Sequence, residues 1–296
     1  MRPEAIAFAA DALRKGEAAG SASAVTVRWL GTAGFAIEHD GHTLLIDPYV
    51  TRASLGRCAV AALRPDLDAI ARYVPRADAI IVGHSHFDHA LDVPDIARAT
   101  GARVFGSQSA VALCRISGLP ESQVDLVERP AGSAPVEREV GPFHLRFVPS
   151  AHSRFLAGRV PFPGDIADCD DVPLRTERYR CGAVFGIDIE VAGRRLYHVG
   201  SAELVEAALT ARPRNVDLLL LCVAGWTSTR DFPERVVRAF SPAAALLHHW
   251  DNFFRPLTRP ATALPAMRMP QLVERLGRAA PEIRTGTLAL LGELHL

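Results

Sequence analysis

Short apolar runs with an alternating pattern open the chain and predict a β-meander. Residues 25–30 alternate between apolar and polar side chains, a glycine-rich turn follows at 31–34, and residues 35–38 continue the pattern. Asp40-Gly41 is typical of a hairpin turn, so residues 42–47 are expected to be the returning strand. This meander therefore predicts that Asp47 stands at the end of a strand.

Helical and strand patterns alternate after the meander. Asp92, with Pro94 in the first turn and Gly101 past the last, is typical of a capped helix. A second series of strand patterns begins near residue 135, and helices and strands again alternate after it. Two sheets packed face to face with helices outside are therefore expected. The other predicted helices are 64–73, 107–116, 203–209, one capped by Asp231 and Glu234, and one after Pro270. The other predicted strands are 79–81, 102–106, 124–127, 135–140, 143–148, 181–191, 194–199, 216–223, 243–247 and one near Leu288.

The N-terminal residues 1–24 are expected to form a helix and a lead-in. Apolar residues recur at helical spacing at Ile6, at Ala9 or Ala10, and at Leu13, and Gly16 is a stop signal. Acidic side chains interrupt this stretch, so an amphipathic helix is favoured over a signal peptide.

The remaining residues, 25–296, are expected to be one domain because no linker or repeat divides them. Prolines, a glycine and aspartates interrupt the pattern between about 153 and 180. That stretch is interpreted as an irregular insertion, and insertions of this length are usually functional lids or disordered.

Composition and charge narrow the function classes. The 296-residue chain has 33 basic and 33 acidic residues and a formal net charge of zero. A neutral chain gives no support to nucleic-acid or membrane-surface binding, and no apolar run approaches the ~18 residues of a membrane span. Five cysteines without paired spacing are typical of reduced thiols. We therefore expect a cytoplasmic protein with a small-molecule substrate; oligomeric state is not indicated.

The strongest chemical signal is the pattern HxHxDH, formed by His84, His86, Asp88 and His89 directly after the apolar run 79–81. His84 and His86 point the same way if the loop is extended, because side chains alternate along such a backbone. Asp88 and His89 lie one turn further on and can face a second point. Imidazoles and a carboxylate at this spacing predict a place for two metal ions side by side.

Several further polar residues stand at the ends of predicted strands. Besides Asp47 and His84, these are His152, Ser201 and His249. Because sites are usually built in the loops at one edge of a sheet stack, we expect these residues to lie near one another.

With these residues in place, the chain resembles the metallo-β-lactamase fold superfamily, and within it the branch of L-ascorbate-6-phosphate lactonase-like and related metal-dependent hydrolases. The resemblance covers about residues 25–255 and implies an α/β fold that is a four-layer αββα sandwich with two mixed β-sheets. It rests on Trp29-Leu30-Gly31-Thr32-Ala33-Gly34-Phe35, Ile46-Asp47-Pro48, the HSHFDH segment, Ser150-Ala151-His152 and His249-Trp250.

The resemblance also implies roles for individual residues. Asp47 would orient a ligand loop, as carboxylates behind metal-bound histidines commonly do. The adjacent His248 and His249 leave an alternative for the last ligand, and His249 is favoured because it precedes Trp250. The ligand set suits zinc, as one or two ions, with manganese or iron possible. One metal would be held by His84, His86 and His152, and the other by Asp88, His89 and His249.

Ser201 departs from the superfamily pattern, which usually places a bridging aspartate after this hairpin. A neutral hydroxyl bridges two cations poorly, so we expect a weaker metal pair, most of all at His84, His86 and His152. Ser201 is also a good N-cap for a helix starting near residue 202. Glu203 could substitute for the missing carboxylate, and His198 is near enough in sequence to support the site from behind.

The expected function is hydrolysis of an ester-type bond, a lactone or a phosphodiester, by metal-activated water. Asp88 would help to move the proton and Asp47 would complete the catalytic set. Three alternatives stay open: a nuclease, which the neutral charge opposes; an iron-dependent persulfide oxygenase, which Ser201 opposes; and a metal-poor binding protein that lost its bridging carboxylate. The sequence does not identify the substrate or its binding residues.

Overall fold

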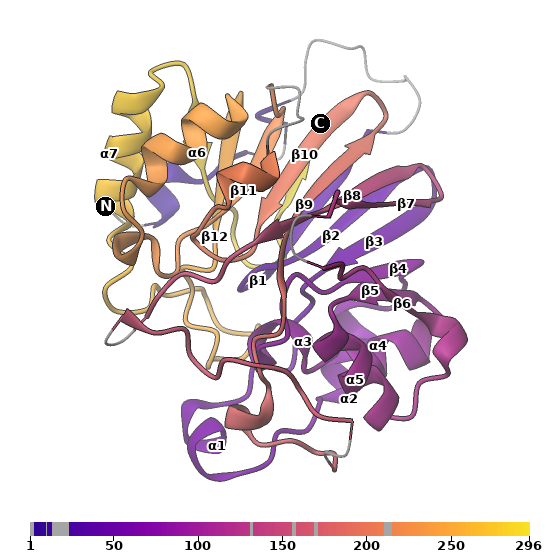
Figure 1. Cartoon of the computed structure of the whole chain (residues 1–296). Helices are drawn as coiled ribbons and strands as arrows, with labels where there is room; N and C mark the ends of the chain where they lie inside the picture. The colour runs from indigo at the N-terminus through magenta and orange to yellow at the C-terminus, as the bar shows by residue number, and fades with distance from the viewer. Residues whose placement is uncertain are drawn as a thin grey trace.

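Two seven-stranded mixed sheets packed between helices form the structure, a computed structural model that describes residues 3–9, 11–13, 24–130, 133–155, 158–168, 171–209 and 215–296 (Figure 1). The predicted α/β architecture, a four-layer αββα sandwich, is confirmed. Each sheet begins with antiparallel strands and continues with parallel ones, which is the order that the two series of patterns predicted.

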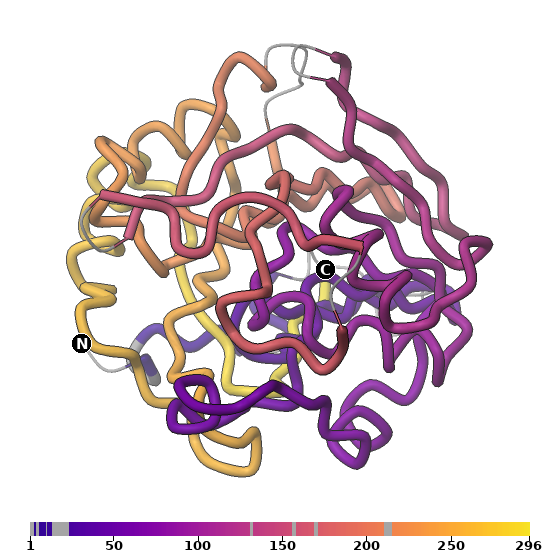
Figure 2. The backbone as a smooth tube through the Cα atoms, turned by 60° about the horizontal axis from the view of Figure 1, so that its bottom comes forward, coloured from indigo at the N-terminus to yellow at the C-terminus, as the bar shows by residue number. Residues whose placement is uncertain are grey.

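The first sheet contains the predicted meander. Strands β1, β2 and β3 pair antiparallel, and β4, β5 and β6 then add in parallel. Strand β14 pairs antiparallel with β1, so the yellow end of the chain lies among the indigo strands (Figure 2). The strand bounds are β1 Thr26–Gly31, β2 Gly34–His39, β3 His42–Ile46, β4 Ala79–Ile81, β5 Arg103–Gly106, β6 Val124–Leu126 and β14 Glu293–His295.

The second sheet repeats this order. Strands β7 to β10 pair antiparallel with their neighbours, and β11, β12 and β13 continue in parallel from β10. The bounds are β7 Val136–Val140, β8 Phe143–Ser150, β9 Val184–Val191, β10 Arg194–Val199, β11 Leu218–Cys222, β12 Ala244–His248 and β13 Arg284–Gly286.

Helices cover the outer faces of both sheets (Figure 1). Helices α2 (Leu67–Tyr73), α4 (Val93–Thr100) and α5 (Gln108–Ile116) pack on the first sheet, and α6 (Phe232–Phe240) and α7 (Met269–Ala279) on the second. The short helices α1 (Leu55–Val60) and α3 (Phe87–Ala90) stand in loops of the first half. Helix α2 is shorter than predicted and begins after Asp66, whose carboxylate accepts a hydrogen bond from the Ala69 amide.

The strand pattern explains how both faces of a sheet are buried. In β3, Leu44 and Ile46 belong to the core between the sheets, whereas Leu45 belongs to the core beneath the first group of helices. Successive side chains point to opposite faces of a strand, so a strand buried on both sides needs a continuous apolar run.

A helix stopped by Gly16 is predicted within residues 1–24, but the described residues 3–9 and 11–13 contain no α-helix. They form a 3-10 helix at Pro3–Ile6, and Ala7 makes a parallel bridge with Thr287. The Phe8 amide donates to the Thr287 carbonyl at 2.8 Å. Extended pairing with the second half of the chain therefore replaces the helix that the local spacing favoured. Residue 10 and residues 14–23 lie outside the described part.

The predicted helix at 203–209 is also wrong. Only a 3-10 helix forms, at Glu206–Leu209. The Ser201 hydroxyl caps no helix; it accepts a hydrogen bond from the Ser153 amide at 2.9 Å. Asp92 stands before α4 as predicted, yet its carboxylate binds the amides of Val50 and Thr51 instead of capping the helix.

The irregular segment 153–180 includes the 3-10 helix Thr176–Arg178. Ile166, Leu174 and Tyr179 are buried in the core of the first half. The segment is thus packed against the domain through apolar anchors despite its lack of regular structure.

The sequence predicts reduced cysteines and no membrane-spanning segment. Cys58, Cys114, Cys181 and Cys222 are free and buried, and Cys169 lies outside the described residues. No helix within the described ranges is long and apolar enough to cross a membrane.

A buried ion pair joins the loop after β3 to the loop after β12. Arg52 and Asp251 are 2.6 Å apart, with side chains 1% and 0% exposed. The other Asp251 oxygen accepts the Thr32 amide at 3.0 Å, and Arg52 also donates to the carbonyls of Asn252 and Arg255. The pair therefore ties three loops together at one edge of the sheets.

We expect Asp251→Asn to lower the free energy of unfolding by about 3–5 kcal/mol, because it leaves the Arg52 charge buried without its partner. Urea unfolding followed by circular dichroism measures the change. The control is Glu274→Gln, which removes the exposed pair with Arg278 and should change stability by less than about 0.5 kcal/mol. Equal effects of the two substitutions would contradict this account.

Candidate metal centre

The histidine-rich segment leaves β4 through a tight turn against Asp47. The Gly83 amide donates to Asp47 Oδ1 at 2.6 Å, and a Cβ on Gly83 would lie 2.9 Å from Asp47 Oδ2. Glycine is therefore required for this close approach. Helix α3 begins directly after His86 and carries Asp88, which lies beside His249, and His89, which lies beside Asp47.

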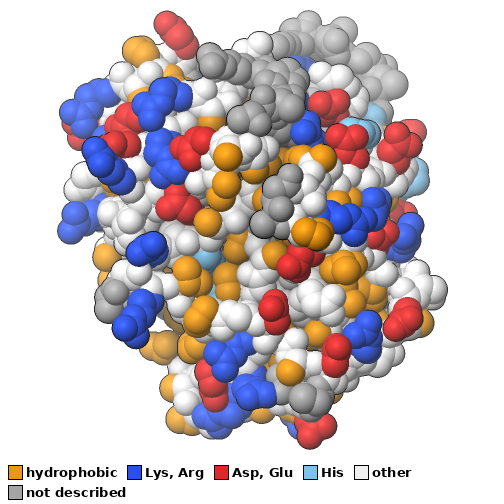
Figure 3. Space-filling view, in the orientation of Figure 1, with side chains coloured by type: hydrophobic (Ala, Val, Ile, Leu, Met, Phe, Trp, Pro, Cys, Tyr) orange, Lys and Arg blue, Asp and Glu red, His pale blue; other side chains and the backbone are white. Residues whose placement is uncertain are grey.

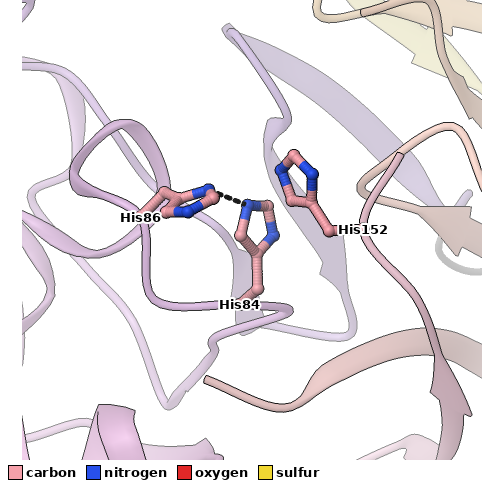
Figure 4. Close-up of side chains that lie close together, drawn as sticks. All are labelled: His84, His86 and His152. Carbon is pink, nitrogen blue, oxygen red and sulfur yellow. Dashed lines mark hydrogen bonds between the residues drawn. The ribbon is translucent and has the colours of Figure 1, made fainter. Parts of the chain in front are cut away.

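Side chains from three distant parts of the chain converge here. The ligand atoms of His84, His86 and His152 lie within 4.8 Å of one another, and Figure 4 shows their rings turned toward a common space. Asp88, His89 and His249 form a second such group, and Asp47, His84 and His89 a third. The expected convergence of the strand-end residues is therefore observed; the segments come from both sheets.

Hydrogen bonds behind three histidines decide which ring nitrogen faces the cluster. His86 Nε2 lies 2.9 Å from the Pro161 carbonyl oxygen, and His152 Nδ1 lies 2.7 Å from that of Ser153. His89 Nδ1 lies 2.8 Å from Asp47 Oδ2. Carbonyl and carboxylate oxygens only accept, so these nitrogens carry the protons. The opposite nitrogens, His86 Nδ1, His152 Nε2 and His89 Nε2, are left with lone pairs.

His84 stands at the centre of the cluster. Its Nε2 lies 3.1 Å from His86 Nδ1, and its ring centroid is 3.8 Å from that of His89. Its Nδ1 is buried without a hydrogen-bond partner. His84 therefore belongs to two of the three groups, the one with His86 and His152 and the one with Asp47 and His89.

The structure places His249, and not His248, in the cluster. His249 Nε2 lies 3.4 Å from Asp88 Oδ2, whereas His248 stacks on His198 with ring centroids 5.0 Å apart. His249 has a left-handed backbone with φ of 58°, and its amide donates to the Thr32 carbonyl. The two adjacent side chains therefore lie in different surroundings, His248 against Phe35 and His198 and His249 beside Asp88.

Burial and the proximity of other imidazoles lower the pKa of three histidines, which therefore stay neutral. Burial, reinforced by nearby His86, lowers the pKa of His152 to about 3, and burial lowers the pKa of His84 and His86 as well. For His89, burial opposes the charge, but Asp47 and Asp88 raise the pKa above its ordinary value. Burial alone would raise the pKa of Asp88, yet the neighbouring imidazoles lower it. Neutral imidazoles beside an ionised carboxylate are the forms that bind cations.

The sequence suggested three residues as supports of the site, Ser201, Glu203 and His198, and the structure places each of them differently. Ser201 holds Ser153, the residue after His152, so it lies beside the cluster. The Glu203 carboxylate pairs with Arg235 at 2.9 Å, so it does not replace the missing aspartate. His198 Nε2 donates to the Ala33 carbonyl, and His198 belongs to none of the three groups.

Sequence reasoning missed two supports of the cluster. The Pro161 carbonyl orients His86, and the Arg52–Asp251 pair holds the Thr32 turn that binds the His249 amide. A backbone carbonyl has no sequence signature. Asp251, by contrast, directly follows His249-Trp250, and its position was a usable signal.

The residues fit a divalent cation. Lone pairs of neutral imidazoles converge with one ionised carboxylate, and each of three rings is fixed from behind, as is typical of metal-binding histidines. His84, His86 and His152 would hold one ion, and Asp88, His89 and His249 a second.

Residues 42–250 match the family model described as a beta-lactamase superfamily domain. The chain is similar to a UPF0173 metal-dependent hydrolase of Pyrobaculum arsenaticum, 26% identical over 64% of this chain and 81% of that protein. A relative of the same name from Myxococcus xanthus is 28% identical over 82% and 76%. The match to an Anaeromyxobacter sp. relative, also 28% identical, spans 64% of that protein.

Solved structures share the fold. Igni18, a metallo hydrolase from Ignicoccus hospitalis, superposes with a TM-score of 0.57 at 17% identity, over 92% of this chain and 98% of that one. CmlA, a diiron beta-hydroxylase from Streptomyces venezuelae, gives 0.57 at 15% identity, over 95% of this chain and 55% of that one. At such identities the likeness concerns the fold alone.

We expect Asp47→Asn to weaken divalent metal binding by about 10–100-fold. Asparagine tolerates the left-handed backbone of Asp47 (φ 44°), but its amide N–H₂ next to His89 Nδ1 favours the tautomer whose proton blocks Nε2. Competition with a zinc-binding dye measures the affinity.

The matched control is Asp40→Asn, the same change at an exposed turn residue with φ of 47°. It should leave metal affinity unchanged. Equal metal affinity of Asp47→Asn and the unsubstituted protein would show that Asp47 does not orient a ligand.

Proposed function

The chain belongs to the metallo-β-lactamase superfamily, and from this membership we propose that it is a metal-dependent hydrolase of ester-type bonds in a small molecule. The observation that supports it most is the convergence of five histidines and Asp88 from both sheets, three of the rings being fixed from behind. The names of its relatives, metal-dependent hydrolases, agree with this proposal. We propose zinc as the metal, because imidazoles with one carboxylate suit it.

When bound, a divalent cation supplies a Lewis acid that brings the pKa of its water down toward ~7 and polarises the oxygen of the bond under attack. The chain would position the cation through histidines whose lone pairs are pre-set by hydrogen bonds to Pro161, Ser153 and Asp47. Asp88 is an ionised carboxylate at neutral pH, and we propose that it helps to move the proton that hydrolysis releases. The neutral net charge of the chain favours a small molecule over RNA as the substrate.

We expect His86→Ala to lower zinc content and to reduce kcat/KM for its best ester or lactone substrate by at least about 100-fold, because it removes one fixed nitrogen from the centre. Elemental analysis and a panel of esters, lactones and phosphodiesters provide the measurements. His144→Ala, which removes an exposed histidine of β8, is the control. Purified protein that holds no metal and keeps its fold would contradict the proposal and favour a binding protein.

We expect Ser201→Asp to tighten metal binding at least several-fold, since it adds a negative charge beside His152 while still accepting the Ser153 amide. Ser201→Asn is the control of nearly equal size without the charge. Calorimetric titration with zinc compares the two variants; identical curves would show that position 201 does not act on the metals.

A further inference from the structure

A row of aromatic rings runs through the cluster and ends in phenylalanine on both sides. Phe162 meets His86 edge-on with centroids 6.3 Å apart, and Phe253 meets His249 edge-on at 5.4 Å. Between them the histidine rings follow one another at 4.8, 3.8 and 5.3 Å. The two phenylalanines therefore contact the first and the last histidine of this series of rings.

Phe162 lies at one end of this row of rings, and its backbone conformation is unfavourable. Its side chain is 37% exposed, and its backbone has a left-handed φ of 41°. A bulky residue in this conformation is a backbone outlier, and such strain persists only where the surroundings impose it. Here they do so on both sides: the preceding carbonyl of Pro161 accepts from His86, and the Phe162 carbonyl accepts the Cys181 amide at 2.9 Å.

At the other end of the row, Phe253 belongs to a packed group of aromatic side chains. Phe253 and Phe254 lie 4.5 Å apart, and Phe254 stacks on Phe87 of α3 at 6.4 Å. Both phenylalanines are only partly buried, although they pack on the core of the first half. In the space-filling view, histidine surface is visible in a recess near the centre, with hydrophobic side chains on both sides (Figure 3).

We infer that Phe162 and the Phe253–Phe254 pair are the walls of the substrate site, and that they select an uncharged ester or lactone with an apolar acyl or aryl group beside the scissile bond. This inference rests on the proposed function. Exposed apolar surface held beside a reactive centre gains free energy when an apolar group covers it. An anionic group there would lose hydration against rings that return no charged hydrogen bond.

The test measures kcat/KM of the zinc-supplemented protein for p-nitrophenyl acetate, butyrate and hexanoate. Each methylene that is fully buried contributes about fourfold, so we expect at least a tenfold rise from acetate to hexanoate. Phe162→Asn should flatten this series, as should Phe253→Leu in part. Val60→Ala, which changes an exposed residue of α1, should leave the series intact.

Phe162→Asn also separates a substrate wall from a structural role. Asparagine adopts the left-handed backbone more readily than phenylalanine, so the variant should unfold at an unchanged or higher temperature while losing the chain-length dependence. A large fall in unfolding temperature would show that Phe162 serves stability instead. Hydrolysis with no dependence on chain length would overturn the inference and leave the proposed hydrolase standing.

If none of these esters is hydrolysed, the inference is tested by the binding of hydroxamates instead. Hexanohydroxamate should bind the zinc-supplemented protein at least tenfold more tightly than acetohydroxamate by calorimetry, and Phe162→Asn should abolish the difference. Equal affinities, or no binding of either compound, would overturn the inference; the second result would count against the metal centre as well.

Discussion

The hydrogen bonds behind the histidines are the constraint on which the centre depends. A neutral imidazole has one donor and one acceptor nitrogen, so fixing the donor on an oxygen commits the other nitrogen to the cluster. Two of these oxygens are backbone carbonyls, of Pro161 and Ser153, and the third belongs to Asp47. Loop geometry therefore sets the protonation pattern of the site. The packing of the irregular segment 153–180 therefore helps to fix the histidines on which the proposed chemistry depends.

Several residues in the loops at the same edge of the sheets have unfavourable backbone conformations. Thr32, Asp47, Arg52 and His249 all have left-handed φ values, although none is a glycine. Each lies in a turn that the Arg52–Asp251 pair or the Asp47 carboxylate holds by hydrogen bonds. Buried, paired charges thus maintain turns that local preference would not adopt, and these turns point His249 at Asp88.

The sequence allowed most of the architecture to be predicted, because long alternating and helical patterns reflect burial. It also placed His84, His86, Asp88, His89, His152 and His249 in one region, since each ends a strand or follows one closely. It failed where a distant partner overrode a local signal. The helical spacing of residues 6–13 was replaced by pairing with Thr287, and the capping signal of Ser201 was replaced by a hydrogen bond to Ser153. The phenylalanine walls could not be predicted either, because an aromatic residue in a loop is equally typical of a core.

The ligand groups come from both sheets: His84, His86, Asp88 and His89 follow β4, whereas His152 follows β8 and His249 follows β12. A cation held by His84 and His152 would act as a reversible cross-link across the sandwich, without a covalent bond. Binding that is confined to the folded state adds about 2.7 kcal/mol when the free cation stands at 100 times its dissociation constant. Metal binding would thereby couple the assembly of the two halves to the availability of metal, and scarcity of the ion would loosen the sandwich at the edge where the candidate ligands meet.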